Sequence, residues 1–331
     1  MNSDLNLIDK LHTYLSSDLG KMNQLILEHL FAKEALIENV GKYLINAGGK
    51  RIRPILTILT GRMLGYNGEN HIKLATAVEF IHAATLLHDD VVDGSKVRRF
   101  KPTANIIWGN KATILVGDFL FSQSFKLMVA TKSLTCLDIL SRASAIIAEG
   151  EVSQLAKLNQ RRLLSEEEYN KIVHAKTAEL FGAACEVGAV IGGGDSEVCS
   201  IMRQFGINLG YIFQISDDLL DYIGNQSKMG KNIGDDFIEG KFTLPLIKLS
   251  AKLDNKQKHW LQNSITAEVR NSDDLAHVQQ LFLINDIKNE ITKDLQDLVR
   301  KTKLLLQKIE LDNDNKQYLQ SLLNFAVYRV H

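Results

Sequence analysis

Two copies of the spacing D-D-x-x-D stand out in this sequence. Each copy consists of three aspartates, Asp89, Asp90 and Asp93 in the first and Asp217, Asp218 and Asp221 in the second. Both lie in apolar stretches with helical spacing, over residues 71–94 and 197–223. Residues four apart share one face of a helix and lie roughly 6 Å from each other. Each copy therefore predicts carboxylates clustered on one side of a mostly apolar helix.

Clustered carboxylates repel one another, and burial increases that repulsion. A single copy would most simply be a solvated helix end, because charged residues are mostly exposed. A second copy favours two helices that face each other across a cavity with six carboxylates. A hard divalent cation such as Mg²⁺ takes carboxylate oxygens together with substrate phosphates. The two motifs together predict a metal–diphosphate site.

Basic residues near glycines could bind the same diphosphate. The segment 48–54 reads Gly-Gly-Lys-Arg-Ile-Arg-Pro, and proline suits the first turn of a helix. Glycine lets the backbone approach a ligand closely, and a helix N-terminus favours anions. Arg98 and Arg99 follow the first motif, where paired arginines can hold diphosphate oxygens in a bidentate way.

These motifs resemble the trans-type polyprenyl diphosphate synthases, specifically the long-chain group that makes quinone side chains. The signatures are the segment 48–54, the two aspartate motifs and the glycine- and lysine-containing stretch 230–241, in this order. The similarity extends from about Leu25 to the C-terminus. It implies an all-α fold, a many-helix isoprenoid synthase bundle with a central cavity. The expectation is one domain over residues 1–331, with residues 1–20 loosely ordered, and a homodimer.

The resemblance also implies the reaction. An allylic diphosphate loses its diphosphate, the alkene of isopentenyl diphosphate attacks the resulting cation, and loss of a proton leaves a chain five carbons longer. The departing diphosphate takes this proton, so the protein needs no general base. Three Mg²⁺ ions per active site are expected. Their ligands are expected to be Asp89, Asp93, Asp217 and Asp221, supported by Asp90 and Asp218.

Further residues are matched to the family by their positions in its motifs. The allylic diphosphate is expected to contact Arg98, Lys176, Lys231 and Lys241. Isopentenyl diphosphate is expected to contact Lys50, Arg53, His82 and Arg99. Thr177 and Gln214 are expected to place oxygen dipoles near the cation. His88 receives no role.

Product length is expected to depend on residues one turn before the first motif. Ala84 and Thr85 lie about 6–7.5 Å along the helix from Asp89. Short-chain members of the family have an aromatic floor there, so the small residues predict an open tunnel. The floor should come instead from the helix that carries Phe119, Phe121 and Phe125, of which Phe125 is our candidate. The expected product is octaprenyl to decaprenyl diphosphate. The alternative is that Ala84 merely permits close helix packing.

Composition narrows the possible partners. The 331 residues contain 39 basic and 39 acidic side chains, so no net positive field attracts nucleic acid. The three cysteines have no metal-ligand spacing and are expected to be buried thiols: Cys136, Cys185 and Cys199. The N-terminus lacks an apolar signal segment, and no run of about 18 consecutive apolar residues could span a bilayer. We expect a cytoplasmic protein whose product is lipid-soluble.

The remaining elements are predicted as helices without strands. Residues 5–46 predict two helices, and residues 113–130 and 134–149 predict two more. Ser165 and Glu168 form a capping box that starts another helix. That helix continues into the small residues 182–184 and 188–189, which allow close helix approach. Asp273 and Asp274 are expected to cap a later helix.

Several other functions remain as alternatives. A shorter-chain synthase making farnesyl or geranylgeranyl diphosphate would use the same motifs. A class I terpene cyclase shares the fold and the first motif, but its second motif normally contains Asn, Ser and Glu. An inactive regulatory subunit would be expected to lack motif residues, and none is missing. A helical phosphohydrolase would be expected to have His-Asp metal pairs, which this sequence lacks.

Overall fold

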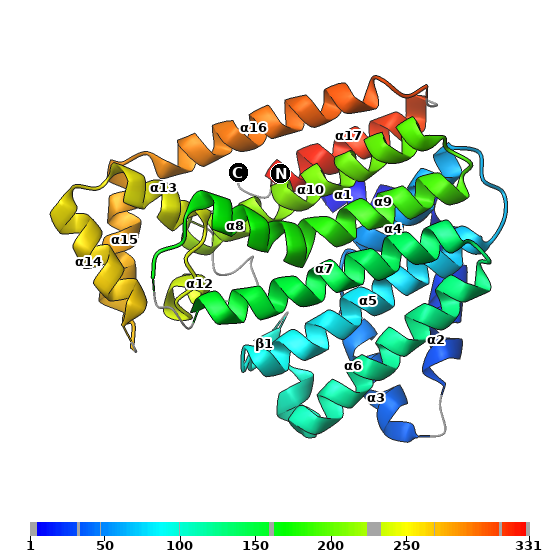
Figure 1. Ribbon diagram of the computed structural model, residues 1–331, viewed down its shortest axis with the longest axis horizontal. Coiled ribbons are helices and arrows are strands. Elements are labelled where there is room, and N and C mark those ends of the chain that lie inside the picture. The colour runs from blue at the N-terminus through cyan, green and yellow to red at the C-terminus, as the bar shows by residue number, and fades with distance from the viewer. Residues whose placement is uncertain are drawn as a thin grey trace. The chain divides into compact units, whose positions relative to one another are not determined.

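The computed structural model describes residues 5–31, 34–46, 48–98, 100–158, 162–223, 233–267, 269–310 and 313–328. These residues are almost entirely helical, as predicted (Figure 1). The first elements are α1 (Leu5–Tyr14), α2 (Ser16–Leu30), α3 (Ala35–Asn46), α4 (Ile52–Met63), α5 (Asn70–Val92), β1 (Val97–Arg98), β2 (Lys101–Pro102), α6 (Ala104–Ala130) and α7 (Leu134–Leu158). Next come α8 (Glu166–Val173), the π-helical turn η1 (His174–Ala178), α9 (Glu179–Ile191), α10 (Ser196–Ile223) and α12 (Asp235–Ile238). The last are α13 (Leu244–Lys252), α14 (Asn255–Thr266), α15 (Ser272–Ile284), α16 (Ile287–Leu306) and α17 (Asn313–Tyr328).

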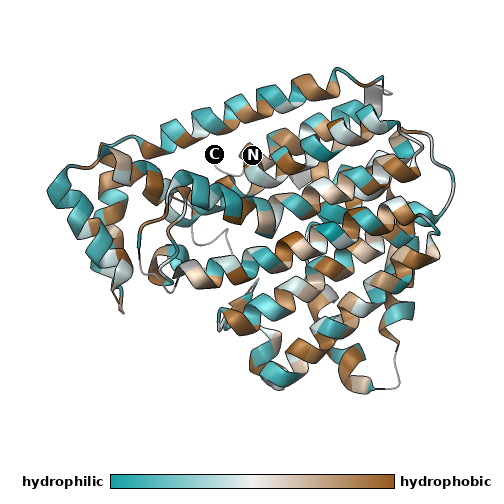
Figure 2. Ribbon diagram, viewed as in Figure 1, coloured by the Kyte–Doolittle hydropathy of each residue, from teal (hydrophilic) through white to brown (hydrophobic). Residues whose placement is uncertain are grey.

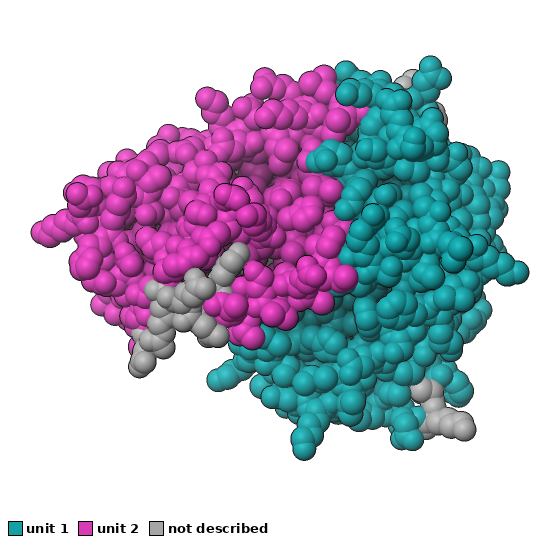
Figure 3. Space-filling view, in the orientation of Figure 1, with its two compact units in different colours: residues 1–144, 180–206, 306–321 teal, residues 145–179, 207–305, 322–331 magenta. Residues whose placement is uncertain are grey.

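The chain forms two compact units, each made of three segments (Figure 3). Unit 1 comprises residues 1–144, 180–206 and 306–321, and unit 2 comprises residues 145–179, 207–305 and 322–331. The segments alternate along the chain, so no single cut in the sequence separates the units. The first aspartate motif lies in unit 1 and the second in unit 2. That the chain is one domain stays a prediction.

Helix α5 is the buried centre of unit 1. It packs against α2, α4 and α6, and its apolar side chains cover all sides of the helix. Phe80, Ile81 and Leu87 are completely buried, which is typical of a core helix. Only its C-terminal turn is rich in charged residues. This burial fixes the position of the first aspartate motif.

Small residues bring α4 and α9 close together, as their spacing predicted. A Cβ atom on Gly188 would lie 2.6 Å from the carbonyl oxygen of Thr57, so no larger residue fits there. The Thr57 hydroxyl donates a hydrogen bond to the carbonyl of Ala184 over 3.0 Å. The close approach therefore lets a buried hydroxyl reach the neighbouring helix backbone.

Unit 2 is built from amphipathic helices. In α16, residues three and four apart are buried, among them Ile287, Ile291 and Leu295. The rest of that helix is mostly hydrophilic (Figure 2). Helix α8 begins with the predicted capping box, in which Ser165 accepts the N–H of Glu168 and Glu168 accepts the N–H of Ser165. Local sequence signals therefore set both the faces and the ends of these helices.

Four local predictions were wrong or incomplete. Residues 5–46 form three helices, because Leu15 and the segment after Leu30 interrupt the pattern. Helix α6 begins at Ala104, nine residues early, and Gly109 with φ of 81° kinks it. Helix α7 continues to Leu158. Residues 97–102 form a short antiparallel hairpin where no strand was predicted.

The predicted cap of α15 is also corrected. Asn271 is the N-cap residue and accepts the N–H of Asp274 over 2.8 Å, whereas Asp273 and Asp274 lie in the first turn. Acidic side chains in the first turn still favour the helix through its dipole. The cysteine prediction is confirmed for Cys136 and Cys185, which are buried, while Cys199 is partly exposed.

Among the described helices, α6 is long and apolar enough to cross a bilayer, judged by length and composition alone. A core helix of a soluble protein passes the same test. Helices α3 and α5 pack on α6, and Gly109 interrupts its regular geometry. That the chain has no membrane span stays a prediction.

A buried ionic network joins α2 to α4 and α5 in unit 1. Arg62 donates two hydrogen bonds to Asp18, from Nε over 2.8 Å and from Nη2 over 2.6 Å. His71 Nε2 lies 3.4 Å from the same carboxylate and is completely buried. Burial lowers the pKa of His71, although Asp18 opposes this effect. Burial favours a higher pKa for Asp18, but Arg62 and His71 outweigh burial and lower it.

This network predicts a loss of stability in mild acid. A histidine with a lowered folded-state pKa binds its proton more readily in the unfolded chain, so stability falls as pH drops below about 6.5. His71→Phe should therefore reduce the loss of unfolding free energy between pH 7 and pH 5, measured by urea denaturation. His259→Phe, at an exposed site on α14, is the control and should leave the slope unchanged. Equal slopes in wild type and His71→Phe would contradict the prediction.

Candidate functional site

The first aspartate motif ends α5, and its middle aspartate is held by the protein. Asp90 is 2% exposed and its Oδ1 accepts hydrogen bonds from Arg98, from Nε over 3.0 Å and from Nη2 over 2.8 Å. Burial raises the pKa of Asp90, although Arg98 opposes this effect. Asp89 is partly exposed and Asp93 is exposed. The motif thus holds one carboxylate internally and presents the other two toward solvent.

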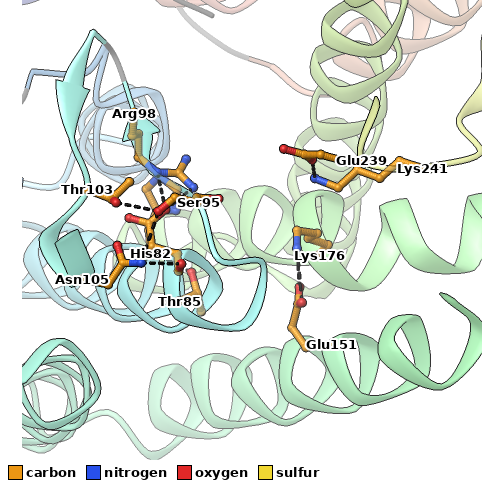
Figure 4. Close-up of polar contacts among 11 residues, drawn as sticks. His82, Thr85, Ser95, Arg98, Thr103, Asn105, Glu151, Lys176, Glu239 and Lys241 are labelled. Carbon is orange, nitrogen blue, oxygen red and sulfur yellow. Dashed lines mark hydrogen bonds and ion pairs between the residues drawn. The ribbon is translucent and has the colours of Figure 1, made fainter. Parts of the chain in front are cut away.

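The segment after the motif is fixed by hydrogen bonds to backbone carbonyls (Figure 4). Asn105 Nδ2 donates to the carbonyls of Asp90 and Ser95 over 3.1 and 3.2 Å, and Thr103 Oγ1 donates to Ser95 over 2.6 Å. These bonds anchor the base of the β1–β2 hairpin, whose first strand carries Arg98. The hairpin therefore places a guanidinium group beside the motif, a contact that the sequence did not predict.

Phe100 lies in the turn of this hairpin with φ of 64° and is 72% exposed. A left-handed conformation costs a residue with a side chain roughly 1–2 kcal/mol, and glycine avoids this cost but loses more entropy on folding. Phe100→Gly should raise the free energy of unfolding by about 0.5–1 kcal/mol. Thermal and urea denaturation test this. Phe100→Ala keeps the strain and is the control. Similar destabilisation of both variants would contradict the prediction and show that the ring makes a stabilising contact.

The second motif lies on α10 and repeats this arrangement in unit 2. Asp218 is 3% exposed and accepts hydrogen bonds from the Tyr169 hydroxyl over 2.6 Å and from Gln214 Nε2 over 2.7 Å. Burial raises the pKa of Asp218 to about 8, with a further contribution from Asp236, while its two donors oppose the shift. Asp217 is partly exposed. The middle aspartate is again held by protein donors while the first is partly exposed, as in the first motif.

Gln214 extends this network to the π-helical turn. Its Oε1 accepts a hydrogen bond from Thr177 Oγ1 over 2.8 Å. Thr177, Gln214, Asp218 and Tyr169 therefore form one continuous chain of hydrogen bonds. The sequence identified the first three residues but missed Tyr169, because no spacing distinguishes a buried tyrosine in α8 from an ordinary core residue.

The last aspartate of the second motif binds backbone. Asp221 is completely buried, and its Oδ2 accepts the N–H of Asp236 over 3.0 Å. Its carbonyl oxygen accepts the N–H of Gly234 over 2.8 Å. Asp221 therefore fixes the start of α12, in the glycine-rich stretch that the sequence identified.

Several predicted cationic residues have acidic or aromatic neighbours. Lys176 lies 3.0 Å from Glu151, and Lys241 lies 2.6 Å from Glu239 (Figure 4). Arg53 Nη1 lies 3.2 Å from His82 Nε2, and its guanidinium carbon lies 4.4 Å from the centre of the Phe181 ring. Lys50 is exposed. Predicted residues Arg99 and Lys231 lie outside the described residues.

The predicted length-determining residues lie in unit 1. Ala84 is 1% exposed, and the Thr85 hydroxyl donates to the carbonyl of His82 over 2.8 Å. Phe125 is 37% exposed and its ring packs edge-to-face on Phe121, with centroids 5.0 Å apart. These contacts leave the predicted role of the three residues untested.

His88, which had no predicted role, contacts α6. Its Nε2 lies 3.2 Å from the carbonyl oxygen of Ile114 and 3.4 Å from Asp118. A Cβ atom on Gly117 would lie 2.4 Å from the same nitrogen. His88 therefore fills a gap that a glycine leaves between α5 and α6.

The donor set suits a hard cation. The carboxylates of Asp89, Asp93 and Asp217 are at least partly exposed, and oxygen is the ligand that Mg²⁺ prefers. Within the described ranges, no three Asp, Glu, His or Cys side chains form a ready metal-binding group. Mg²⁺ commonly binds through one or two carboxylates plus substrate phosphates, so a ready cage is not required.

Comparison with known proteins identifies the family. The model of the polyprenyl synthetase family matches residues 34–282. The chain belongs to this family. Octaprenyl diphosphate synthase from Escherichia coli K12 is 44% identical over 240 residues, which cover 72% of this chain and 74% of the relative.

Two solved structures are similar over almost the whole chain. The polyprenyl synthase from Caulobacter crescentus, complexed with calcium and isoprenyl diphosphate, is 42% identical, with a TM-score of 0.91 and 98% of each chain covered. A decaprenyl diphosphate synthase from Rhodobacter capsulatus is 41% identical, with a TM-score of 0.92, and the match covers 98% of this chain and 99% of that one. The predicted family and the all-α isoprenoid synthase fold are confirmed, and the chain is a prenyltransferase.

The Tyr169–Asp218 hydrogen bond gives a testable prediction. Tyr169→Phe removes one donor from a buried carboxylate, which should cost roughly 1.5–3 kcal/mol of unfolding free energy. Tyr211→Phe is a matched control, because its hydroxyl donates to the carbonyl of Asn170 over 3.1 Å and not to a carboxylate. Urea denaturation of both variants should show the larger loss for Tyr169. Equal losses would mean that Asp218 does not depend on this donor.

Proposed function

We propose that this chain condenses isopentenyl diphosphate with an allylic diphosphate to make a long all-trans polyprenyl diphosphate, octaprenyl to decaprenyl, for quinone side chains. The observation that carries the proposal is the matched geometry of the two motifs. In both, the middle aspartate is held by protein donors while the first remains partly exposed. In a member of the polyprenyl synthetase family, this arrangement favours a site for a cation and a diphosphate over a solvated helix end that binds no ligand.

Divalent cations complete the proposed site. The family is in general magnesium-dependent, and one similar structure was solved with calcium. When bound, Mg²⁺ supplies Lewis-acid stabilisation of the departing diphosphate. Asp89, Asp93, Asp217 and Asp221 would hold three such ions. Asp90 and Asp218 keep the motifs in shape through Arg98 and Tyr169, their hydrogen-bond donors.

The cationic side chains bind and orient the two diphosphates. Arg98, Lys176, Lys231 and Lys241 contact the allylic diphosphate in this proposal. Lys50, Arg53, His82 and Arg99 contact isopentenyl diphosphate, which requires protein cations in place of metal. Charge-assisted hydrogen bonds of this kind are the stronger ones in proteins.

Oxygen dipoles stabilise the positive charge that develops on the allylic carbon. Thr177 and Gln214 are already joined by a 2.8 Å hydrogen bond, which fixes the orientation of both side chains. Fixed dipoles need no reorganisation when charge develops, and such preorganisation is a major source of catalysis.

A product assay tests the proposed function. Purified protein is incubated with farnesyl diphosphate, radiolabelled isopentenyl diphosphate and Mg²⁺, and the products are dephosphorylated and separated by chain length. The expected result is label in octaprenyl to decaprenyl alcohols. Farnesyl or geranylgeranyl products would identify a shorter-chain synthase. Cyclic hydrocarbon products would identify a terpene cyclase, and absence of products would favour a regulatory subunit.

Removing a proposed metal ligand should abolish turnover without unfolding the chain. Asp89→Ala should lower kcat by several orders of magnitude, because electrostatic stabilisation of the leaving group is usually the largest catalytic contribution. Stability should be unchanged or slightly higher, because one member of a repulsive cluster is lost. The control is Asp138→Ala, which removes an exposed aspartate on α7. Near-normal turnover of Asp89→Ala would contradict the assignment.

Product length gives a further prediction. In this proposal Ala84 leaves the tunnel open, so Ala84→Tyr should shift products toward farnesyl or geranylgeranyl diphosphate while the first condensation continues. Ala84 is buried, so thermal denaturation must accompany the product analysis. Ala83→Tyr is the control, because the adjacent residue projects about 100° away around the helix. Full-length product from a folded Ala84→Tyr variant would show that the residue that ends the product tunnel lies elsewhere.

We also propose that the enzyme is a cytoplasmic homodimer that binds no nucleic acid. Exposed apolar side chains on α6, among them Ile106, Leu115 and Val129 at 56–66% exposure, would be covered by the second copy. Sedimentation of the purified protein measures its oligomeric state directly, and a monomer would contradict the proposed homodimer. Large exposed apolar patches often mark a surface that binds another protein chain.

A further inference from the structure

The helix that carries Lys176 and Thr177 contains a π-helical turn, η1, between α8 and α9. In this turn the backbone N–H of Glu179 donates to the carbonyl of His174, five residues earlier. Such turns insert one extra residue into an α-helix and occur frequently at functional sites. The extra residue rotates everything on one side of it by about 100° relative to a regular helix. The direction in which the Lys176 and Thr177 side chains point therefore depends on this turn.

An ion pair connects the two ends of the turn. His174 Nε2 lies 3.2 Å from Glu179 Oε2, and the Glu179 side chain is completely buried while that of His174 is 36% exposed. In a regular α-helix, residues five apart project about 140° from each other and cannot pair. The i→i+5 hydrogen bond of a π turn stacks them. The pair is therefore possible only because of the π turn.

Neighbouring helices pack closely against the backbone of the turn. A Cβ atom on Gly150 of α7 would lie 2.3 Å from the Cβ of Ala175, and one on Gly210 of α10 would lie 2.6 Å from the Cα of Ala178. These glycines hold the backbone of the turn in place. The Tyr211 ring faces the His174 imidazole with centroids 6.3 Å apart.

Lys176 and Thr177, the two proposed substrate-binding residues of the turn, both contact side chains in unit 2. Lys176 lies 3.0 Å from Glu151 on α7 (Figure 4), and Thr177 donates to Gln214 on α10 over 2.8 Å. Without the extra residue, α9 would be rotated by about 100° relative to α8. A regular helix through this segment could therefore not keep both contacts and also keep the packing of α8 and α9.

We infer that His174 and Glu179 are positioning residues whose ion pair holds the π-helical turn that orients Lys176 and Thr177 toward the allylic substrate. The inference rests on the proposed function, because the orientation of these two side chains matters only if the allylic diphosphate binds beside them. Neither His174 nor Glu179 contacts a substrate in this account.

The test variant is the double substitution His174→Ala/Glu179→Met. It removes the ion pair without leaving an unpaired buried charge, which would destabilise the fold by itself. The expected result is a rise of about tenfold or more in the KM for farnesyl diphosphate, similar to the loss of one charge-assisted hydrogen bond. The KM for isopentenyl diphosphate should stay within about twofold of wild type, since the turn carries none of its contacts.

Three comparisons complete the test. His174→Gln retains an N–H donor and should restore the KM for farnesyl diphosphate to near wild type. Lys171→Ala removes an exposed ion pair to Glu167 one turn earlier and should change neither KM. Hydrogen exchange of a peptide covering residues 174–183 should accelerate in the double variant but not in Lys171→Ala, whether or not the enzyme is active.

The outcomes separate this inference from the proposed function. If the wild type makes no prenyl product while hydrogen exchange responds as expected, the proposed function fails and the π-turn assignment stands. If wild type is active and the folded double variant keeps both wild-type KM values and exchange, the glycine contacts alone hold the turn and the inference is wrong. A uniform rise in both KM values would also overturn it, because that would indicate a general structural defect.

Discussion

The burial of carboxylates in an apolar setting is the constraint on which this structure depends. Asp90, Asp218 and Asp221 are almost completely buried on helices whose other residues form the cores of their units. A buried carboxylate without donors would cost several kcal/mol or take up a proton. The fold must therefore supply donors to the buried aspartates. In the proposed function the exposed aspartates bind the cation, together with Asp221, which also accepts one backbone N–H. Both requirements determine which side chains surround the two motifs.

The donors come from elements far from each motif in sequence or unusual in form. A two-stranded hairpin supplies Arg98 to Asp90, α8 supplies Tyr169 to Asp218, and the first residues of α12 supply a backbone N–H to Asp221. The hairpin turn places Phe100 in a left-handed conformation, and the connection after α8 contains a π-helical turn. Irregular backbone therefore lies beside both motifs, where strained geometry is often tied to function, although Lys132 and Asp286 have positive φ elsewhere in the chain.

The sequence predicted the parts of the site that depend on local periodicity. The two motif helices, the capping box at Ser165 and the small residues of α9 were all correct, because helix faces and ends are set by residues three or four apart. The family was also predicted correctly, since four signatures in one order are highly specific.

Contacts between distant segments could not be predicted in this way. Tyr169 and Glu151 lie in ordinary amphipathic helices, and nothing in their spacing indicates a partner 49 or 25 residues away. The hairpin was missed because two-residue strands give no alternating pattern. The π turn was missed because its side-chain contact joins residues five apart, a spacing that a regular helix does not bring together.

The proposed function requires both aspartate motifs to bind one metal–diphosphate group, and a double-mutant cycle tests this proposal most directly. Mg²⁺-dependent binding of inorganic pyrophosphate would be measured by calorimetry for wild type, Asp89→Asn, Asp217→Asn and the double variant. Groups that share one ligand give coupling energies of roughly 0.5–3 kcal/mol, whereas independent sites add. The account predicts a clearly non-additive double variant. Strictly additive losses of binding free energy would contradict the account. Full-strength pyrophosphate binding by a variant with only one intact motif would also contradict it.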